Sequence, residues 1–190
     1  MKCNLQNVKK ILNILCYWIL PLGLLAVSFA VPDAKIFGLS GKAAMILLIA
    51  ILFVSPLATI TQWRFFKSIL GFRRQLGIAI FWLAFFHTVG FIYVQDLTQA
   101  VLYFDFGYHL FYGAIAMIGM ALLAATSNNR AVGYLRRHWK KVQFITYPVF
   151  FLVLIHASMA TGEWQKLIVF GSAYVIFKVV AWQLVRRRKK

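Results

Sequence analysis

The sequence predicts an all-α integral membrane protein, a bundle of six transmembrane helices that forms a single domain over residues 1–190. Hydrophobic residues make up 62% of the chain and charged residues only 13%, a balance that a water-soluble fold of this size does not tolerate. The basic residues gather in short clusters between apolar runs. Both features are typical of a chain whose solvent is lipid.

Six stretches reach or approach the length of about 20 mostly apolar residues that a helix needs to cross the hydrocarbon core. They run approximately from Ile11 to Val31, Ala43 to Thr61, Leu76 to Val94, Phe106 to Ala125, Val142 to Ser158, and Leu167 to Val185. The fifth stretch is the shortest and contains Pro148, which lacks a backbone N–H. We therefore expect a kink in the fifth span.

The first stretch has a second interpretation as a signal peptide. Lys2, Lys9 and Lys10 precede an apolar run that ends in the small residues Ser28 and Ala30. The run is longer than the apolar region of about 7 to 15 residues in a typical signal peptide, which favours a transmembrane helix. Cleavage would leave the remaining topology unchanged.

Loop charge predicts that both termini lie in the cytoplasm, because cytoplasmic loops are enriched in Lys and Arg. One side carries seventeen basic residues and no acid: Lys2, Lys9, Lys10, Arg64, Lys67, Arg73, Arg74, Arg130, Arg136, Arg137, Lys140, Lys141, Arg186, Arg187, Arg188, Lys189 and Lys190. The other side carries three basic residues and all four acids: Lys35, Lys42, Lys166, Asp33, Asp96, Asp105 and Glu163. Loops at about 32 to 42, 95 to 105 and 159 to 166 are therefore expected outside. A net charge of +17 that is confined to loops is a topology signal and argues against a nucleic-acid partner.

The connection from Arg130 to Lys141 mixes basic residues with apolar ones, as a segment at the lipid headgroups would. We favour a basic loop anchored by Trp139 over a docking site for a soluble partner. Cys3 and Cys16 lack the spacing of a metal site or of a disulfide framework, so both are expected to be free thiols.

Ionisable residues within a span are costly and are candidates for function. His87 lies in the third span and His156 in the fifth, whereas His109 lies at the outer start of the fourth and His138 in a basic loop. With a helical rise of 1.5 Å per residue, His87 lies roughly 20 Å and His156 roughly 22 Å from the cytoplasmic edge. Two neutral imidazoles at matched depth on different helices are what a low-spin b-type haem needs.

The residues alone leave other uses of the two histidines open: hydrogen-bonded packing, a proton relay or metal transport. The absence of Asp and Glu from the spans argues against a proton-coupled transporter, and Lys178 can extend to the interface without any function. Gly77 and Gly90 flank His87, and Gly113 and Gly119 lie in the fourth span. These glycines allow close helix approach or clearance for a porphyrin face, and we favour the former.

Several short runs, in their order and spacing, resemble the MsrQ family, also called YedZ. They are Ser40-Gly41-Lys42-Ala43-Ala44, Ser55-Pro56-Leu57-Ala58, Arg73-Arg74-Gln75-Leu76-Gly77 followed by His87, and Leu135 with Trp139-Lys140-Lys141-Val142-Gln143-Phe144-Ile145-Thr146-Tyr147 followed by His156. Members of this family are haem-binding membrane subunits of bacterial periplasmic protein-methionine-sulfoxide reductase systems, within the ferric-reductase-like transmembrane superfamily. The resemblance covers nearly the whole chain.

The resemblance implies a b-haem protein of the bacterial inner membrane with His87 and His156 as axial ligands of the haem iron. It further implies that the chain passes electrons to a periplasmic molybdopterin-containing reductase subunit, which repairs oxidised methionine in periplasmic proteins. The chain would then be an electron-transfer subunit without catalytic residues of its own, surrounded by membrane lipid. Whether the chain alone counts as an enzyme stays open.

The family has a further histidine at the position matched by Gln143, thirteen residues before His156. An amide is a poor ligand for haem iron compared with an imidazole. We therefore expect one haem b near the outer face, with two as the alternative if His138 or another group substitutes. A cytosolic flavin donor would face a gap of roughly 20 Å, judged from the helix rise, so a quinol from the quinone pool is the simpler donor. FMN or a quinone is the further cofactor that these donors imply.

Two other functions remain open. The chain could be a ferric reductase or cytochrome b of a different system, or a small transporter or scaffold in which both histidines only pack. The sequence has no GxGxxG motif and no residual length for a nucleotide-binding domain. We therefore expect the reducing electrons to come from a quinol or from a cytosolic flavin reductase.

Overall fold

The structure, a computed structural model, describes residues 2–30, 33–95 and 108–188. All regular secondary structure within these ranges is helical, as predicted. The elements are α1 (Lys2–Ile14), the π-helical turn η1 (Leu15–Ile19), α2 (Leu20–Ala30), α3 (Ala34–Thr61), α4 (Arg64–Leu70), α5 (Arg73–Gln95), α7 (His109–Ala125), α8 (Asn129–Leu135), the 3₁₀ turn η2 (Arg136–His138), α9 (Trp139–Gln143), α10 (Thr146–Thr161) and α11 (Gln165–Arg187).

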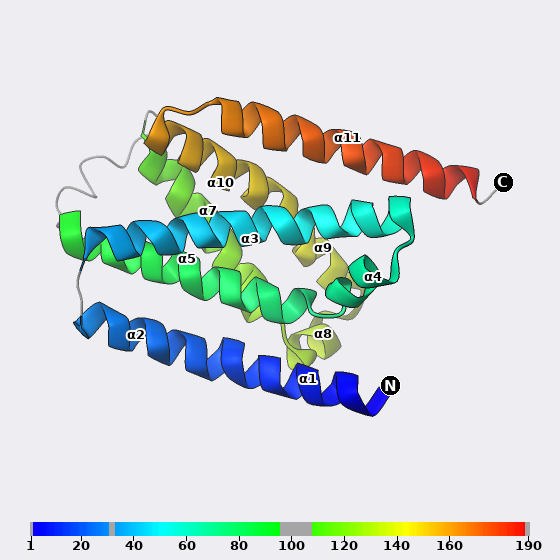
Figure 1. Ribbon diagram of the computed structural model, residues 1–190, viewed down its shortest axis with the longest axis horizontal. Coiled ribbons are helices and arrows are strands. Elements are labelled where there is room, and N and C mark those ends of the chain that lie inside the picture. The colour runs from blue at the N-terminus through cyan, green and yellow to red at the C-terminus, as the bar shows by residue number, and fades with distance from the viewer. Residues whose placement is uncertain (1, 31–32, 96–107, 189–190) are drawn as a thin grey trace.

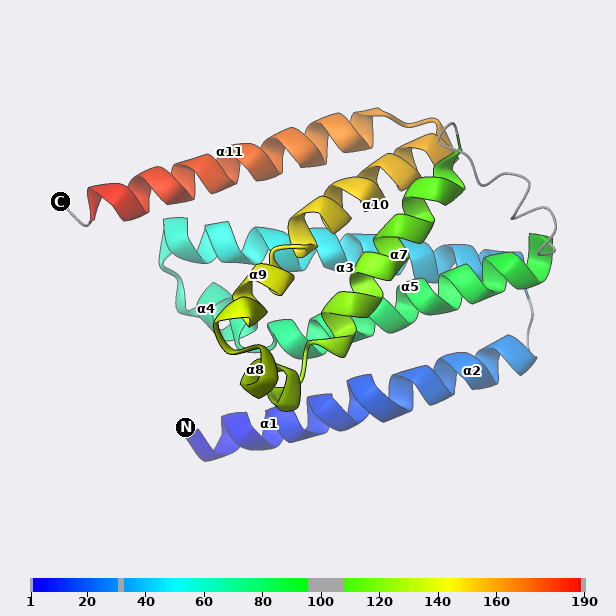
Figure 2. The same ribbon diagram turned by 180° about the vertical axis from the view of Figure 1, so that it is seen from behind.

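The long helices run side by side along the bundle, and the short helices α4, α8 and α9 gather at one end of it (Figure 1 and Figure 2). The start of α1 and the finish of α11 lie at this same end. We call it the basic end, because α4, α8 and α9 contribute Arg64, Lys67, Arg130, Lys140 and Lys141. The other end, where Asp33 and Glu163 lie, is the acidic end. Termini at one end agree with the predicted even number of crossings, while the orientation toward the cytoplasm stays a prediction.

Four helices of the described chain are long and apolar enough to cross a membrane: Gln6–Val27, Ala34–Thr61, Arg73–Val94 and Gln165–Arg187. These overlap the predicted first, second, third and sixth spans. The loop predicted at about 32 to 42 is wrong over most of its length, because α3 is helical from Ala34. The predicted fourth span begins within residues outside the described ranges, and α7 itself has 17 residues. Together with the helical segment Asn129–Gln143, from which a bend of 92° separates it, α7 makes a fifth candidate. Six crossings therefore remain a prediction, because α10 is apolar but only 16 residues long.

The fifth predicted span, Val142 to Ser158, is interrupted in the structure at Phe144 and Ile145, within one turn before Pro148, where the kink was expected. The α10 helix begins at Thr146, so Pro148 occupies its first turn. A backbone N–H in the first turn has no partner within the helix, so proline costs nothing there. The chain also bends by 92° between α7 and the segment Asn129–Gln143, and Trp139 donates from Nε1 to the Thr126 carbonyl across this bend at 3.0 Å. Trp139 thus anchors this segment to the rest of the protein.

A buried core joins four helices, because apolar side chains from each face the bundle axis. It consists of Ala44, Leu48, Ile51 and Leu52 of α3, Ile80 and Ala84 of α5, Phe150 and Leu154 of α10, and Tyr174 of α11. The first span packs at the margin, with only 6% of its most apolar window buried, against 39% for α3. Cys16 is a buried free thiol on this first span, as predicted, and the side chain of Cys3 lies outside the described part.

Two of the four singled-out glycines allow the close helix approach that we favoured. A Cβ at Gly90 would lie 2.0 Å from the ring of Phe37 on α3, and one at Gly119 would lie 2.4 Å from Val149 on α10. Gly77 differs, since nothing lies within 4 Å of its Cβ position. Lys178 donates to the Tyr147 hydroxyl at 2.9 Å and lies 4.6 Å from that ring, so it has a partner inside the protein.

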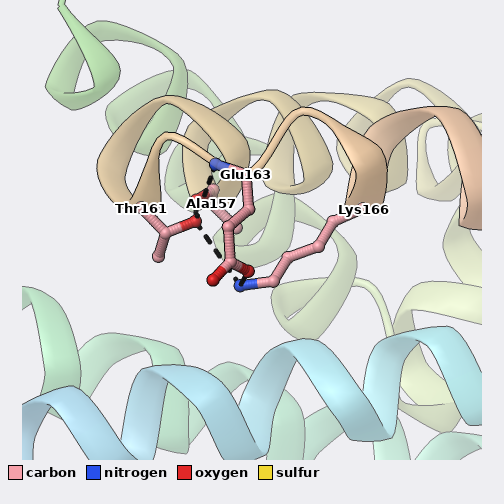
Figure 3. Close-up of polar contacts among 4 residues, drawn as sticks. All are labelled: Ala157, Thr161, Glu163 and Lys166. Atoms are coloured by element: carbon pink, nitrogen blue, oxygen red, sulfur yellow. Dashed lines mark hydrogen bonds and ion pairs between the residues drawn. The ribbon is translucent and has the colours of Figure 1, made fainter.

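The turn between α10 and α11 closes the acidic end. Gly162 ends α10 with φ of 72°, a left-handed conformation that glycine adopts without steric cost. Lys166 pairs with Glu163 at 2.6 Å, and Thr161 accepts from the Lys166 ammonium at 3.4 Å (Figure 3). Asp96 and Asp105, predicted for the same side, lie outside the described residues.

Candidate functional site

Three histidines from three helices meet at the acidic end. His87 of α5 and His156 of α10 have ring centroids 6.3 Å apart, with ring planes at 69°. His109, at the start of α7, has its ring centroid 5.4 Å from that of His156. The structure thus brings together the two predicted ligands, whose depths had been matched from helix rise alone, and adds His109. His138 is exposed in η2, at the basic end.

Main-chain carbonyls fix the tautomer of both candidate ligands. Nδ1 of His87 lies 2.9 Å from the Phe37 carbonyl oxygen, and Nδ1 of His156 lies 2.8 Å from the carbonyl oxygen of His109. A carbonyl only accepts, so each Nδ1 carries a hydrogen and donates it. In a neutral imidazole this leaves the lone pair on Nε2, the atom that can bind a metal. Such outer hydrogen bonds orient metal-binding histidines and raise their basicity.

A glycine one helical turn beyond each carbonyl makes room for the donating ring. Gly41 is four residues after Phe37, and a Cβ there would lie 2.8 Å from Nδ1 of His87. Gly113 is four residues after His109, and a Cβ there would lie 2.7 Å from Nδ1 of His156. In a helix the carbonyl of residue i points toward residue i+4, so a side chain at that position would stand beside the carbonyl. Both rings are therefore seated in the same way on two different helices.

The spacing of the two rings can be compared with the needs of a shared metal. A ligating nitrogen lies about 1.1 Å from the imidazole centroid and about 2.0 Å from the metal, so trans imidazoles have centroids about 6 Å apart. The observed 6.3 Å matches this value. Haem iron is commonly held by histidine, and a bis-imidazole site needs one ring on each face of the macrocycle. The donor set, the tautomer and the spacing therefore fit a haem at His87 and His156. The described residues contain no cluster of three or more His, Cys, Asp or Glu that could hold a bare metal ion.

The basic end holds a cavity of about 720 Å³, which Gln143 lines together with residues of α1, α3, α5, α7 and α10. Gln143 donates from Nε2 to the Thr126 hydroxyl at 3.3 Å. Neither His nor Cys lines the cavity, and His138 is not among its lining residues. Met120 does line it, but a thioether ligates haem iron together with a histidine. The cavity lining therefore offers no imidazole at the position of Gln143, and His138 does not supply one there.

The sequence pointed to the ligand pair but not to the groups that seat it. Carbonyl oxygens have no residue signature, so the roles of Phe37 and His109 were invisible. The spacing of four residues from Phe37 to Gly41 and from His109 to Gly113 was the available signal. This spacing becomes informative only when it is known which helices pack against residues 37–41 and 109–113.

Comparison with known proteins gives a family match across most of the bundle. The family model described as "Ferric reductase like transmembrane component" matches residues 40–155, a range that contains His87 and His109 and stops one residue before His156. No solved structure matches this chain.

Curated relatives carry the name "Protein-methionine-sulfoxide reductase heme-binding subunit MsrQ". The chain is 30% identical over 152 residues to the one from Brucella ovis, which covers 78% of this chain and 66% of the relative. It is 28% identical over 149 residues to the one from Brucella anthropi, covering 77% and 66% respectively. The chain thus spans about two thirds of the length of these relatives.

Proposed function

Because the chain belongs to the ferric reductase like transmembrane component family, with MsrQ subunits among its relatives, we propose that it is a membrane electron-transfer subunit that holds one haem b. His87 and His156 are the axial ligands. The acceptor is a periplasmic molybdopterin-containing methionine-sulfoxide reductase, the partner class that the relatives' name suggests. The location is the bacterial inner membrane, with both termini in the cytoplasm.

The seating of the two imidazoles is the observation that carries this proposal. Each ring donates from Nδ1 to a main-chain carbonyl, at 2.9 Å for His87 and 2.8 Å for His156, which leaves the lone pair of each neutral ring on Nε2, and the two ring centroids lie 6.3 Å apart. Phe37 and Phe86 pack beside His87 with ring centroids 5.0 Å apart, and both are nearly fully buried. The two hydrogen bonds to main-chain carbonyls hold the rings in place. When bound, haem supplies one-electron oxidation and reduction of its iron.

The donor must deliver electrons to a site far from the cytoplasmic face. His87 is thirteen residues from Arg74 at the basic end, a rise of roughly 20 Å. The lack of an imidazole or thiol around the basic-end cavity supports a single haem, and hence no inner relay centre. A quinol from the quinone pool diffuses within the bilayer and can approach at the depth of the histidines. It is our first choice of donor, with a cytosolic flavin reductase and FMN as the second.

Absorption spectroscopy tests the haem assignment. Protein purified from haem-replete cells should show a Soret band, and dithionite reduction should sharpen the visible bands. His87→Ala and His156→Ala should each lose most of the bound haem, because each variant keeps only one of the two iron ligands. His138→Ala is the matched control, because His138 is exposed at the other end, and it should keep the wild-type spectrum.

A colourless preparation would contradict the proposal and favour a scaffold or transporter in which the histidines only pack. The partner is tested separately. Reduced protein in proteoliposomes should be reoxidised with turnover by the molybdopterin-containing reductase together with a methionine-sulfoxide peptide, whereas the reductase alone should accept only the electrons that its own oxidised centre holds. Reoxidation by ferric chelates alone, at the same rate, would favour a ferric reductase.

A further inference from the structure

The cavity at the basic end has an apolar interior and a cationic lining. Leu48, Ile51, Leu52, Ile80 and Val149 contribute its apolar walls. Lys9, Arg73, Arg74 and Lys140 contribute four positive charges from α1, α5 and α9. The volume of about 720 Å³ lies within the range of ligand sites in proteins. The space therefore suits an amphiphile with an apolar body and a negative group.

No carboxylate neutralises the cations of this cavity. Its lining contains neither Asp nor Glu, and the acids that the structure describes, Asp33 and Glu163, belong to the acidic end. A second cavity of about 370 Å³ adjoins it, shares Lys9 and Gly71, and adds Arg64 and Lys67. Cations gathered between transmembrane helices without counter-charges form sites for anionic lipid headgroups.

A buried amide at this cavity lacks a partner for its oxygen. Gln75 is only 6% exposed, and its Nε2 donates to Asn13 Oδ1 at 2.9 Å, whereas its Oε1 accepts no hydrogen bond among the described residues. Buried polar groups are almost always paired, so an unpaired acceptor on a cavity wall indicates a donor from a bound molecule. The ligand should thus carry a hydroxyl or another donor close to its negative group.

We propose that this cavity binds an anionic phospholipid with a hydroxylated headgroup, of which phosphatidylglycerol is the simplest example. Its phosphate pairs with Arg73, Arg74 and Lys140, its glycerol hydroxyl donates to Gln75 Oε1, and an acyl chain lies against the apolar walls. FMN also carries a phosphate ester on a largely planar body, so the test includes both the phospholipid and FMN. This proposal rests on the cavity alone and is independent of the haem assignment.

Native mass spectrometry of the full chain, released from nanodiscs of mixed lipids, measures the bound lipid directly. Phosphatidylglycerol should be retained over phosphatidylcholine by about tenfold or more relative to the bulk ratio, because each Lys or Arg near an anionic headgroup contributes about 1 kcal/mol. It should be retained about 2- to 10-fold over phosphatidic acid, as one hydrogen bond would predict. The double variant Arg73→Gln/Lys140→Gln should lose the first preference, and Gln75→Leu the second.

The matched control is Arg137→Gln/Arg187→Gln, which removes the same charge from two exposed residues that line neither cavity. It should retain the wild-type preference, and the Soret band reports folding in every variant. Equal loss in both double variants, or no preference in the wild type, would overturn the proposal. So would FMN bound at one per chain that displaces the lipid. A failed lipid preference with an intact Soret band leaves the haem assignment standing.

Discussion

The two ends of the bundle use the same helices in opposite ways. At the acidic end, α5, α7 and α10 bring three histidine rings together, each with its centroid no more than 6.3 Å from that of another. Glycines beside two of these rings leave room that a larger side chain would fill. At the basic end, residues of these helices line a cavity of about 720 Å³, and Gly77 faces open space. The difference teaches that one end is packed to hold groups in fixed positions, while the other leaves space for a ligand.

The largest effect should come from filling the room beside a ligand ring. Gly113→Ala places a methyl group 2.7 Å from Nδ1 of His156, and Gly41→Ala places one 2.8 Å from Nδ1 of His87. Each substitution should displace its ring, break the bond to the carbonyl and lower haem content several-fold. Absorption and electron paramagnetic resonance spectra should show high-spin haem in what remains. Unchanged low-spin spectra in both variants would contradict the seating of the rings.

A smaller effect on haem is expected at Gly90, which lies against the ring of Phe37. A Cβ there would meet the ring of Phe37 at 2.0 Å, and Phe37 is buried, so it has little space to move. Overpacking of this kind costs about 1–3 kcal/mol of unfolding free energy. Denaturant unfolding in mild detergent measures it. A variant as stable as the wild type would show that α3 and α5 separate easily.

The opposite sign is expected at Gly77, on the same helix but at the cavity. Gly77→Ala meets no atom within 4 Å and removes the entropic cost of a glycine inside a helix. Stability should therefore increase by about 0.5–1 kcal/mol, with haem content unchanged. The same unfolding experiment, run beside Gly90→Ala, gives the comparison. A destabilised Gly77→Ala would mean that the cavity is narrower than described.

The smallest effect on haem should come from Gln143. Gln143→Leu removes the bond to Thr126 and leaves His87, His109 and His156 untouched. Haem content per chain should stay at the wild-type value, because no iron ligand is lost. Loss of about half the haem on this change would instead assign a second haem to the basic end.

Helix content and most span positions could be predicted from the sequence, because hydropathy acts locally. The predicted spans that contain Leu48, His87 and Tyr174 agree with α3, α5 and α11. The region before α10 could not be placed, since Pro148 disfavours helix interiors but is well tolerated in a first turn. Whether Pro148 lies in a helix interior or in a first turn depends on where the chain bends after α7, which is a tertiary feature.

The candidate site was predictable to the level of residue and depth. His87 and His156 stood out because ionisable groups within spans are rare, and a constant helical rise placed them level. The part played by His109 was not predictable, since its main-chain carbonyl, rather than its ring alone, contacts His156. The basic-end cavity was equally hidden, because its lining comes from helices far apart in the sequence.

The number of haems per chain tests the central claim most directly. Pyridine haemochrome assay with quantitative amino-acid analysis of the purified full chain gives this ratio. One low-spin haem per chain is predicted, held by His87 and His156, with none in the basic-end cavity. A ratio of two, or a ratio of zero from haem-replete cells, would contradict the account.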